Sequence, residues 1–345
     1  MKTAISLFSG TGGDSLGIVN SGLELVAYSE IEEKFRKSHS KNFKECKLLG
    51  DGDIRNTSHE IFLNYNKKID LIFAGFPCQG FSNAGKKDQN DPRNTLFREF
   101  LRAVSLVKPK RIIGENVKGL LTKKTSREEN YIDVIVKEFQ KLGYHITFKV
   151  MKCHLYGIPQ KRERLIIVGD LEKKYTFPEE KIEDLNLKNI VKFSMKGALK
   201  IEKEDFDMTT IPKECILEDL ENEELENNPH PNLKLLAKDK DYTYSGKTYP
   251  RRLSFGKRDS SIHGEIIDIR TPSKTIICTY ARQPRLFVPL KNKNGYFLRC
   301  LLPVELKMIQ GFPEDFCIEG NTNDQIVQIG NAVPPPLVEK IIKNF

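Results

Sequence analysis

The sequence predicts an α/β fold built on an open sheet that begins with a nucleotide-binding unit. Residues 3–8 are rich in β-forming side chains, and a glycine-rich turn at 9–13 and an apolar helical pattern from Leu16 follow them. Two later apolar runs, at 69–73 and 112–113, also end at glycine. Strand, tight turn and helix in this succession are typical of nucleotide-binding sheets.

The other elements follow from hydrophobic periodicity and from the glycines and prolines that end each run. Helices are predicted at residues 31–42, 96–107, 131–142, 303–310 and 335–343, and strands at 23–29, 144–151 and 164–169. The strand at 23–29 ends at Glu30, the place where an acid typically binds ribose hydroxyls.

The composition is that of a globular protein. The chain has 345 residues, of which 30% are charged and 39% hydrophobic, so it is long enough for two domains. No apolar run reaches the roughly 18 residues of a membrane helix, and the N-terminus enters a strand at once, so we expect a cytoplasmic protein without a signal peptide. The net charge of +9 permits nucleic-acid binding but does not prove it.

The cysteines and histidines do not predict a metal site. The seven cysteines are widely spaced, form no Cys-x-x-Cys pair and are odd in number, and the six histidines are scattered. Reduced thiols, no disulfide framework and no metal are therefore expected.

Cys78 lies in the turn that follows the apolar run at 69–73. Gly75 permits close backbone approach, and Pro77 stiffens the chain before the cysteine. Ligands of open α/β sheets bind beyond the carboxyl ends of strands, so this thiol is placed for chemistry. For a cysteine taken alone, a buried structural role is the more common alternative.

Five segments, in order, resemble the cytosine-C5 DNA methyltransferases. They are Phe8-Ser9-Gly10-Thr11-Gly12-Gly13, Phe76-Pro77-Cys78-Gln79, Glu115-Asn116-Val117, Gln160-Lys161-Arg162-Glu163-Arg164 and Gln328-Ile329-Gly330-Asn331-Ala332-Val333. The resemblance covers nearly the whole chain except about residues 171–265. It implies a Rossmann-like methyltransferase sheet with helices on both faces (residues 1–170 and 322–345) and a smaller, mostly irregular and β target-recognition domain (171–321).

The resemblance implies S-adenosylmethionine as cofactor and S-adenosylhomocysteine as product. Glu30 would hold the ribose with Ile31 packed beside it, and Asp53 and Ile54 would address the adenine. The implied cofactor set is Phe8, Gly10, Thr11, Gly12, Gly13, Glu30, Ile31, Asp53, Ile54, Pro77, Leu96, Asn331 and Val333. Ser6 is a departure, because the family usually has aspartate there.

The resemblance also implies the catalytic set. Cys78 would add to C6 of a flipped-out cytosine, Glu115 would act at N3, and Arg164 would hold O2 and orient Glu115. Arg162 belongs to the same implied set, and Gln79, Ser82 and Arg93 are implied to contact DNA.

A basic stretch suggests where DNA is bound. Residues 234–258 carry eight Lys or Arg among four aromatic side chains, and Arg251 and Arg252 are the candidates for direct contact. A basic hairpin with core aromatics is the alternative. Residues 202–226 hold eleven acids and are interpreted as a solvated face. We expect a monomer that binds double-stranded DNA, is nucleoid-associated when bound, and has a restriction endonuclease as a candidate functional, not necessarily physical, partner.

Two other functions remain open at this point. The tRNA-modifying branch of the family has Pro-Pro-Cys and a Cys-Phe-Thr element, whereas this chain has Phe76-Pro77-Cys78 and Cys278-Thr279-Tyr280. A catalytically inactive DNA-binding module on the same scaffold is the other, against which the presence of Cys78, Glu115 and Arg164 argues.

Overall fold

The computed structural model describes residues 2–77, 96–125, 128–238, 241–244, 246–250, 253–257 and 264–345. The chain divides into two compact units, described separately below. The first comprises Met1–Glu183, Gln310–Gly320 and Asn331–Phe345, and the second comprises Asp184–Ile309 and Asn321–Gly330.

These boundaries differ from those expected at residues 170 and 322. Residues 171–183 belong to the first unit because Tyr175 is buried there and its hydroxyl donates to the Ile341 carbonyl at 2.7 Å. Residues 310–320 belong to it because Asn42 exchanges two hydrogen bonds with the backbone of Cys317, at 2.8 and 3.0 Å. Residues 322–330 fall in the second unit.

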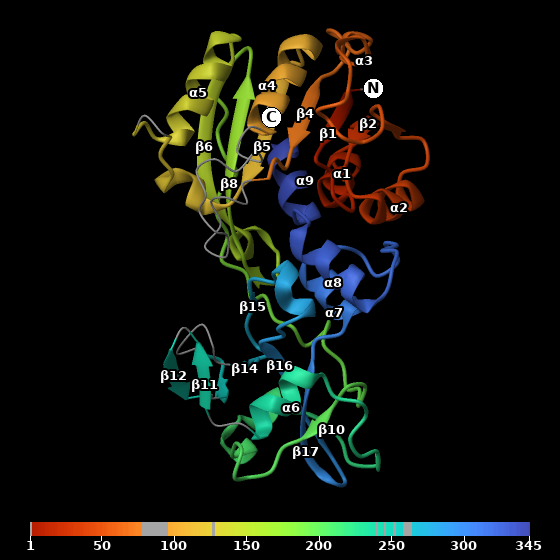
Figure 1. Ribbon diagram of the computed structural model, residues 1–345, viewed down its shortest axis with the longest axis vertical. Coiled ribbons are helices and arrows are strands. Elements are labelled where there is room, and N and C mark those ends of the chain that lie inside the picture. The colour runs from red at the N-terminus through yellow and green to blue at the C-terminus, as the bar shows by residue number, and fades with distance from the viewer. Residues whose placement is uncertain are drawn as a thin grey trace. The chain divides into compact units, whose positions relative to one another are not determined.

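The first unit is an α/β sandwich (Figure 1). Its strands are β1 (Thr3–Leu7), β2 (Glu24–Ser29), β3 (Lys47–Leu48), β4 (Leu71–Ala74), β5 (Arg111–Asn116), β6 (His145–Lys152), β7 (Gln160–Lys161) and β8 (Glu163–Asp170). Its helices are α1 (Gly13–Asn20), α2 (Glu33–Asn42), α3 (His59–Leu63), α4 (Leu96–Val107), α5 (Tyr131–Lys141) and α9 (Pro335–Lys343). Short 3-10 turns occupy Lys118–Thr122 and Cys153–Tyr156.

The order of the seven-stranded sheet creates a site for a ligand. The order across the sheet is β3-β2-β1-β4-β5-β8-β6. The strands β3, β2, β1, β4 and β5 are parallel to one another, and β8 runs antiparallel to its neighbours β5 and β6. From β1 the chain proceeds outward to β2 on one side and later to β4 on the other. The switch point therefore lies between β1 and β4, and open α/β sheets bind ligands beyond the carboxyl ends of strands at such a point.

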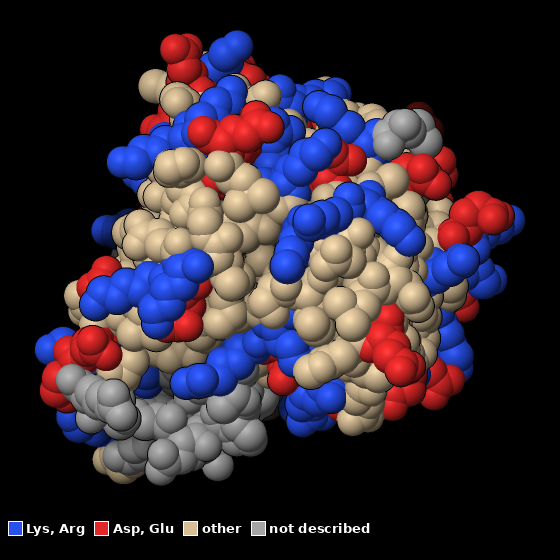
Figure 2. Space-filling view, turned by 90° about the horizontal axis from the view of Figure 1, so that it is seen from above, with Lys and Arg blue, Asp and Glu red and all other residues tan. Residues whose placement is uncertain are grey.

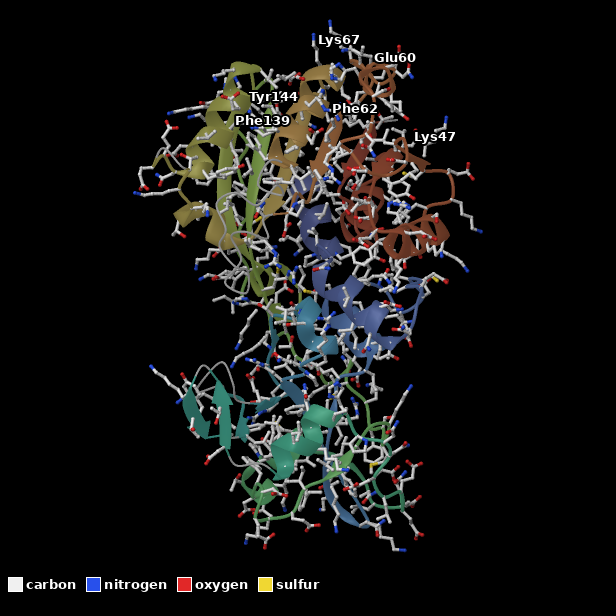
Figure 3. All side chains as sticks on the ribbon, in the orientation of Figure 1. Lys47, Glu60, Phe62, Lys67, Phe139 and Tyr144 are labelled. Carbon is white, nitrogen blue, oxygen red and sulfur yellow. The ribbon has the colours of Figure 1, made fainter. Side chains whose placement is uncertain are left out.

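Helices cover both faces of this sheet, as predicted. Alternate residues of β4 face opposite ways: Ile72 and Ala74 join a core with α3, α4 and α5, whereas Leu71 and Phe73 join a core with α1 and α9. In Figure 3, Phe62, Phe139 and Tyr144 lie in the first of these cores, whereas Lys47, Glu60 and Lys67 are exposed. Burial of both faces explains why the strands read as continuous apolar runs.

The second unit is built on a six-stranded mixed sheet. Its strands are β9 (Leu199–Lys200), β10 (Leu217–Asp219), β13 (Leu253–Phe255), β14 (Gly264–Ile266), β16 (Leu286–Asn292) and β17 (Gly295–Cys300). The hairpin β11 (Asp241–Tyr244) and β12 (Lys247–Pro250), strand β15 (Ser273–Lys274) and helices α6 (Pro231–Lys238), α7 (Pro303–Ile309) and α8 (Thr322–Asn331) complete it. Short 3-10 turns occupy Met208–Thr210, Lys213–Cys215 and Cys278–Ala281.

Charges of both signs lie on one face of the protein. The face seen in Figure 2 carries Lys and Arg interspersed with Asp and Glu. In the acidic segment 202–226, Glu214 pairs with Arg270 at 2.7 Å and Glu218 with Lys291 at 3.2 Å, so cations of its own unit neutralise part of its charge.

Within the described ranges, no helix is long and apolar enough to cross a membrane.

A buried ion pair holds β17 to α7 in the second unit. Arg299 and Glu305 form two parallel hydrogen bonds, at 2.7 and 2.8 Å, with side-chain exposures of 0% and 4%. Backbone groups bind other atoms of both side chains: the Lys192 carbonyl accepts from Arg299 at 2.6 Å, and the Leu302 N–H donates to Glu305 at 2.8 Å. Removing one partner would leave the other as an uncompensated buried charge.

We therefore expect Glu305→Gln to lower the free energy of unfolding by about 3–5 kcal/mol. Lys293→Ala is the control, since it removes an exposed pair with Glu223 that is worth about 0–1 kcal/mol. Chemical denaturation of the full chain measures both changes. A loss below about 1 kcal/mol for Glu305→Gln would contradict the prediction.

Candidate active site

The elements that meet at the switch point converge on Gly75, the first residue after β4. Its N–H donates to the Leu7 carbonyl at 3.2 Å. A Cβ at this position would lie 3.7 Å from the Phe8 carbonyl oxygen, 3.8 Å from a Val333 methyl group and 3.9 Å from Glu115 Oε2. The structure thus brings together the turn after β1, the C-terminal segment and the end of β5, although these lie far apart in the sequence.

The turn after β1 is held by an acid at the end of β2. Glu30 is 8% exposed, and its two carboxylate oxygens accept from the Gly10 and Glu32 N–H groups, each at 2.8 Å. Burial raises the pKa of Glu30. Gly10 and Gly12 have φ of +57° and +99°, a region that suits glycine. The glycine turn is therefore joined to the acid after β2 by a hydrogen bond, a contact that the sequence did not predict.

The surroundings of Glu30 fit a nucleotide cofactor. Ile31, directly after it, is 54% exposed. Among the described residues, the Thr11 hydroxyl is buried without a hydrogen-bond partner. An exposed apolar side chain for a base, a carboxylate for ribose and a glycine turn for close approach are the features that such a cofactor needs.

Two residues expected near the adenine are engaged elsewhere. Asp53 forms hydrogen bonds with Arg55 at 2.9 and 3.0 Å, and these lower the pKa of Asp53. Ile54 is 3% exposed and packs in the core under α3 and α4. Leu96 begins α4 and is half-buried, and Pro77 is half-buried after β4.

Glu115 and Arg164 form the charged pair of the site. Glu115 lies near the end of β5 and Arg164 near the start of the neighbouring β8, and Arg164 Nε contacts Glu115 Oε1 at 2.7 Å. Their side chains are 11% and 15% exposed. The antiparallel pairing of β5 with β8 is what places a basic motif, 49 residues away in the sequence (164 − 115), beside this acid.

Asn116 is a site residue to which sequence reasoning gave no role. Its Nδ2 donates to the Phe76 carbonyl oxygen at 3.0 Å, and its Oδ1 accepts from the Val117 N–H at 2.8 Å. Asn116 is 2% exposed. Phe76 is 3% exposed, and its ring packs against that of Phe100. The segment just before Cys78 is therefore anchored to the end of β5. The signal available in the sequence was that Asn116 directly follows Glu115 at a strand end.

Arg162 is held by the C-terminal segment. It is 1% exposed, and its Nη2 donates to the Ala332 carbonyl at 3.1 Å. Gln310 donates to the same carbonyl at 2.5 Å and accepts from Gln160 at 2.6 Å. These contacts fix residues 331–333 against the turn after β1, where a Cβ on Gly13 would lie 2.2 Å from the Val333 carbonyl. Asn331 is exposed and Val333 is buried.

Several predicted site residues lie outside the described residues. They are Cys78, Gln79, Ser82, Arg93, Arg251 and Arg252. Within the described part of the chain, no group of three or more His, Cys, Asp and Glu side chains is arranged to hold a metal ion.

The sheet order defines a Rossmann-like fold, and the glycine turn held by Glu30 and the Glu115–Arg164 pair lie near its switch point. A family model described as C-5 cytosine-specific DNA methylase matches residues 2–345. The chain belongs to this family. It is therefore an enzyme that methylates C5 of cytosine in DNA and depends on S-adenosylmethionine.

Individual relatives agree with this assignment. The chain is 30% identical to the type II methyltransferase M1.HphI of Haemophilus parahaemolyticus, over 98% of this chain and 85% of the relative. It is 33% identical to M.Eco47II of Escherichia coli, over 96% and 76% of the two chains. The solved structure of the Entamoeba histolytica methyltransferase EhMeth shares the fold, with a TM-score of 0.65, 19% identity and coverage of 100% and 97%.

Proposed function

We propose that this enzyme methylates cytosine within a specific sequence of double-stranded DNA, through an adduct between Cys78 and C6 of a base flipped out of the duplex. The observation that carries the proposal is the convergence on Gly75 of the Phe8 turn, Val333 and Glu115, three residues before Cys78. The family as a whole supports DNA as substrate, and a base inside a duplex must be extruded before chemistry at its ring atoms.

Binding of S-adenosylmethionine is assigned to the turn after β1 and the end of β2. Glu30 holds the ribose hydroxyls, Ile31 covers the base, and Phe8, Gly10 and Gly12 line the approach. The proposed cofactor-binding wall also includes Thr11, Gly13, Asn331 and Val333. Pro77 and Leu96 are proposed to belong to the same binding site. The buried Arg162 supports the pocket through Ala332, and the ion pair with Arg55 leaves Asp53 a smaller part than expected. The cofactor supplies a methyl group on a positively charged sulfur.

Residues of β4, β5 and β8 activate the cytosine. The thiolate of Cys78 adds to C6, which makes C5 nucleophilic toward the methyl group. Glu115 carries a proton at N3 as charge develops there, and Arg164 holds Glu115 in position and contacts O2. Once C5 carries the methyl group, a base removes the C5 proton and the Cys78 sulfur leaves C6. The Phe76 carbonyl, with one lone pair taken by Asn116, keeps a second for the 4-amino group.

DNA contact is assigned to the loop after β4 and to the second unit. Gln79, Ser82 and Arg93 follow Cys78 in the sequence, and residues 234–258 contribute Arg251 and Arg252. The guanidinium fork of arginine matches both phosphate and guanine edges. Partial neutralisation of 202–226 by Arg270 and Lys291 supports its role as a solvated face of the second unit.

The experiment that tests the proposal is methyl incorporation into matched substrates. Purified enzyme with S-adenosylmethionine labelled in the methyl group is offered duplex DNA and, separately, tRNA. We expect label in DNA, at C5 of cytosine in one short sequence when mapped by bisulfite sequencing. Label in tRNA alone would favour the tRNA-modifying branch, and label in neither would favour an inactive DNA-binding module.

Glu30→Gln tests the cofactor pocket. We expect weaker binding of S-adenosylmethionine by about 1.5–3 kcal/mol, because a charge-assisted hydrogen bond to the ribose is lost. Isothermal titration calorimetry measures the change. Glu33→Gln is the matched control, since Glu33 is exposed and pairs with Lys37 on α2. Unchanged affinity in Glu30→Gln would mean that the pocket is wrongly assigned.

A further inference from the structure

A buried chain of hydrogen bonds lies beneath the glycine-rich turn, and no step proposed above uses it. Ser6 comes from β1, Ser9 from the turn, Asp14 and Ser15 from the first turn of α1, and His39 from α2; all five are at most 4% exposed. His39 Nε2 lies 2.9 Å from Ser15 Oγ, Ser15 Oγ lies 3.0 Å from Ser9 Oγ, and Ser9 Oγ bonds Ser6 Oγ. Ser6 donates to Asp14 Oδ2.

The direction of this chain is fixed by its two ends. An ionised carboxylate only accepts, so Ser6 gives its single proton to Asp14. Each hydroxyl has one proton, so Ser6 must accept from Ser9, and Ser9 must in turn accept from Ser15. Ser15 must then accept from the ring of His39. Among the described residues, His39 Nδ1 has no hydrogen-bond partner. The ring proton therefore forms a hydrogen bond only when it is on Nε2, where it is donated to Ser15. Burial lowers the pKa of His39 to about 3, which keeps the ring neutral.

The chain holds a turn that needs support. Phe8, a non-glycine residue, has φ of +57°, and such a conformation persists only where its surroundings enforce it. Ser9 supplies part of that enforcement: its N–H donates to the Ser29 carbonyl at 2.9 Å, and its own carbonyl accepts from Gly12 at 3.0 Å. Glu30 holds Gly10 from β2, so the turn is fixed by one carboxylate on each side, Glu30 and Asp14.

We propose that Asp14 is a positioning residue for the cofactor: through Ser6 and Ser9, its ionised carboxylate holds residues 8–13 in the shape that binds S-adenosylmethionine. The inference rests on the assignment of this turn to the cofactor in the proposed function. Asp14, in the first turn of α1, accepts from the buried hydroxyl of Ser6 on β1, so the helix brings a carboxylate to the base of the turn. The helix N-terminus also favours a negative charge at Asp14.

Protonation of Asp14 makes the effect measurable. Burial raises the pKa of Asp14 to about 7. Below that pH a neutral carboxyl that donates to Ser6 would reverse the chain and move the His39 proton to Nδ1, which has no partner. The ionised form is lost as pH falls, so binding weakens in acid: at pH 6 about a tenth of Asp14 is ionised, and the apparent Kd rises about tenfold.

Other titratable groups around Asp14 do not produce the same signal. Glu30 faces it from the end of β2, His39 from α2, and Cys46 from the segment after α2. Helix α9 meets α1 at Gly17 through Pro335 and Val338, which do not titrate. His39 and Cys46, with pKa values of about 3 and 12, stay neutral between pH 6 and 8. The charge of Glu30 raises the pKa of Asp14, so the two carboxylates are coupled, and the pH dependence that Asp14→Asn loses is the part that needs Asp14.

Calorimetric binding of S-adenosylmethionine to the full chain at pH 6, 7 and 8 tests the inference. The unaltered enzyme should bind about tenfold more weakly at pH 6 than at pH 8. Asp14→Asn should bind at least tenfold more weakly at pH 8 and show little change between pH 6 and 8, because the amide mimics the neutral acid. Asp133→Asn, at an exposed aspartate in the first turn of α5, is the matched control and should behave as the unaltered enzyme does.

Wild-type affinity at pH 8 in Asp14→Asn, or a pH dependence equal to that of the unaltered enzyme, would overturn the inference. If thermal unfolding shows that Asp14→Asn does not fold, Ser6→Ala decides instead, because it keeps the charge but cuts the chain. Unchanged affinity and pH dependence in Ser6→Ala would then overturn it. Failure of the proposed function looks different, since the unaltered enzyme would not bind the cofactor at any pH.

Discussion

Replacing Cys78 by serine is expected to abolish methyl transfer to DNA while S-adenosylmethionine binding stays close to wild type. A serine hydroxyl is a far weaker nucleophile at neutral pH than a thiolate, and the two side chains are similar in size. The expectation rests on the position of Cys78 directly after Gly75, Phe76 and Pro77. These three residues are fixed by the convergence at Gly75 and by the Asn116–Phe76 hydrogen bond. Single-turnover methylation of duplex DNA, with calorimetry for the cofactor, measures both effects.

Four other cysteines are poor candidates for the nucleophile. Burial raises the pKa of Cys153 to about 11 and the pKa values of Cys46, Cys215 and Cys300 to about 12. Few thiolates exist at neutral pH at such values, so these thiols are inert. Cys317→Ser is a suitable control, since Cys317 lies on the first unit and its thiol donates to Glu319.

A covalent trap identifies the nucleophile directly. Duplex DNA containing 5-fluorocytosine should remain attached to the enzyme after methyl transfer, because fluorine at C5 does not leave as a proton does. Digestion and mass spectrometry should locate the adduct at Cys78. An adduct at any other cysteine, or substantial methylation by Cys78→Ser, would remove Cys78 from the proposed role.

Local sequence signals sufficed for much of the first unit. Helices at 96–107 and 335–343 have the predicted bounds, because apolar spacing and a nearby proline mark both. Helix α8 was not predicted. Gly330 lies inside this helix. Glycine is required there because a Cβ would lie 2.4 Å from the Cys278 backbone nitrogen, a contact between residues distant in the sequence.

In the site, too, features with a local sequence signal were predicted, and contacts between residues distant in the sequence were not. A glycine turn after β1, an acid after β2 and a polar pair at the end of β5 are visible in the sequence because each lies at the carboxyl end of a strand. Partners that arrive from elsewhere are not: Gln160 with Gln310, Arg162 with Ala332, and Asp14 with Ser6 depend on tertiary packing. Asp53 forms hydrogen bonds with Arg55, only two residues away, and its contact with the adenine stays a prediction.

Replacing Glu115 by glutamine is expected to slow methyl transfer by about 10²–10⁴-fold, the range typical of losing a positioned general acid or base. Glutamine keeps the shape of the side chain but cannot carry a proton to N3. Glu115 is 8% exposed and does not belong to the assigned cofactor wall, so affinity for S-adenosylmethionine should change little. Glu138→Gln, which breaks a surface pair with Lys141 on α5, is the control and should retain normal rates.

From the Glu115–Arg164 contact we expect that the rate losses caused by replacing the two residues are not additive. Arg164 Nε meets Glu115 Oε1 at 2.7 Å, so the two side chains act as one unit, and effects of such residues do not add. Arg164→Ala should also slow methyl transfer, but the double variant with Glu115→Gln should be about as slow as the slower single variant. Single-turnover rates of the four proteins give the coupling. Rate losses that multiply would show that the two residues act independently, and Arg164 would then have to act on the base without Glu115.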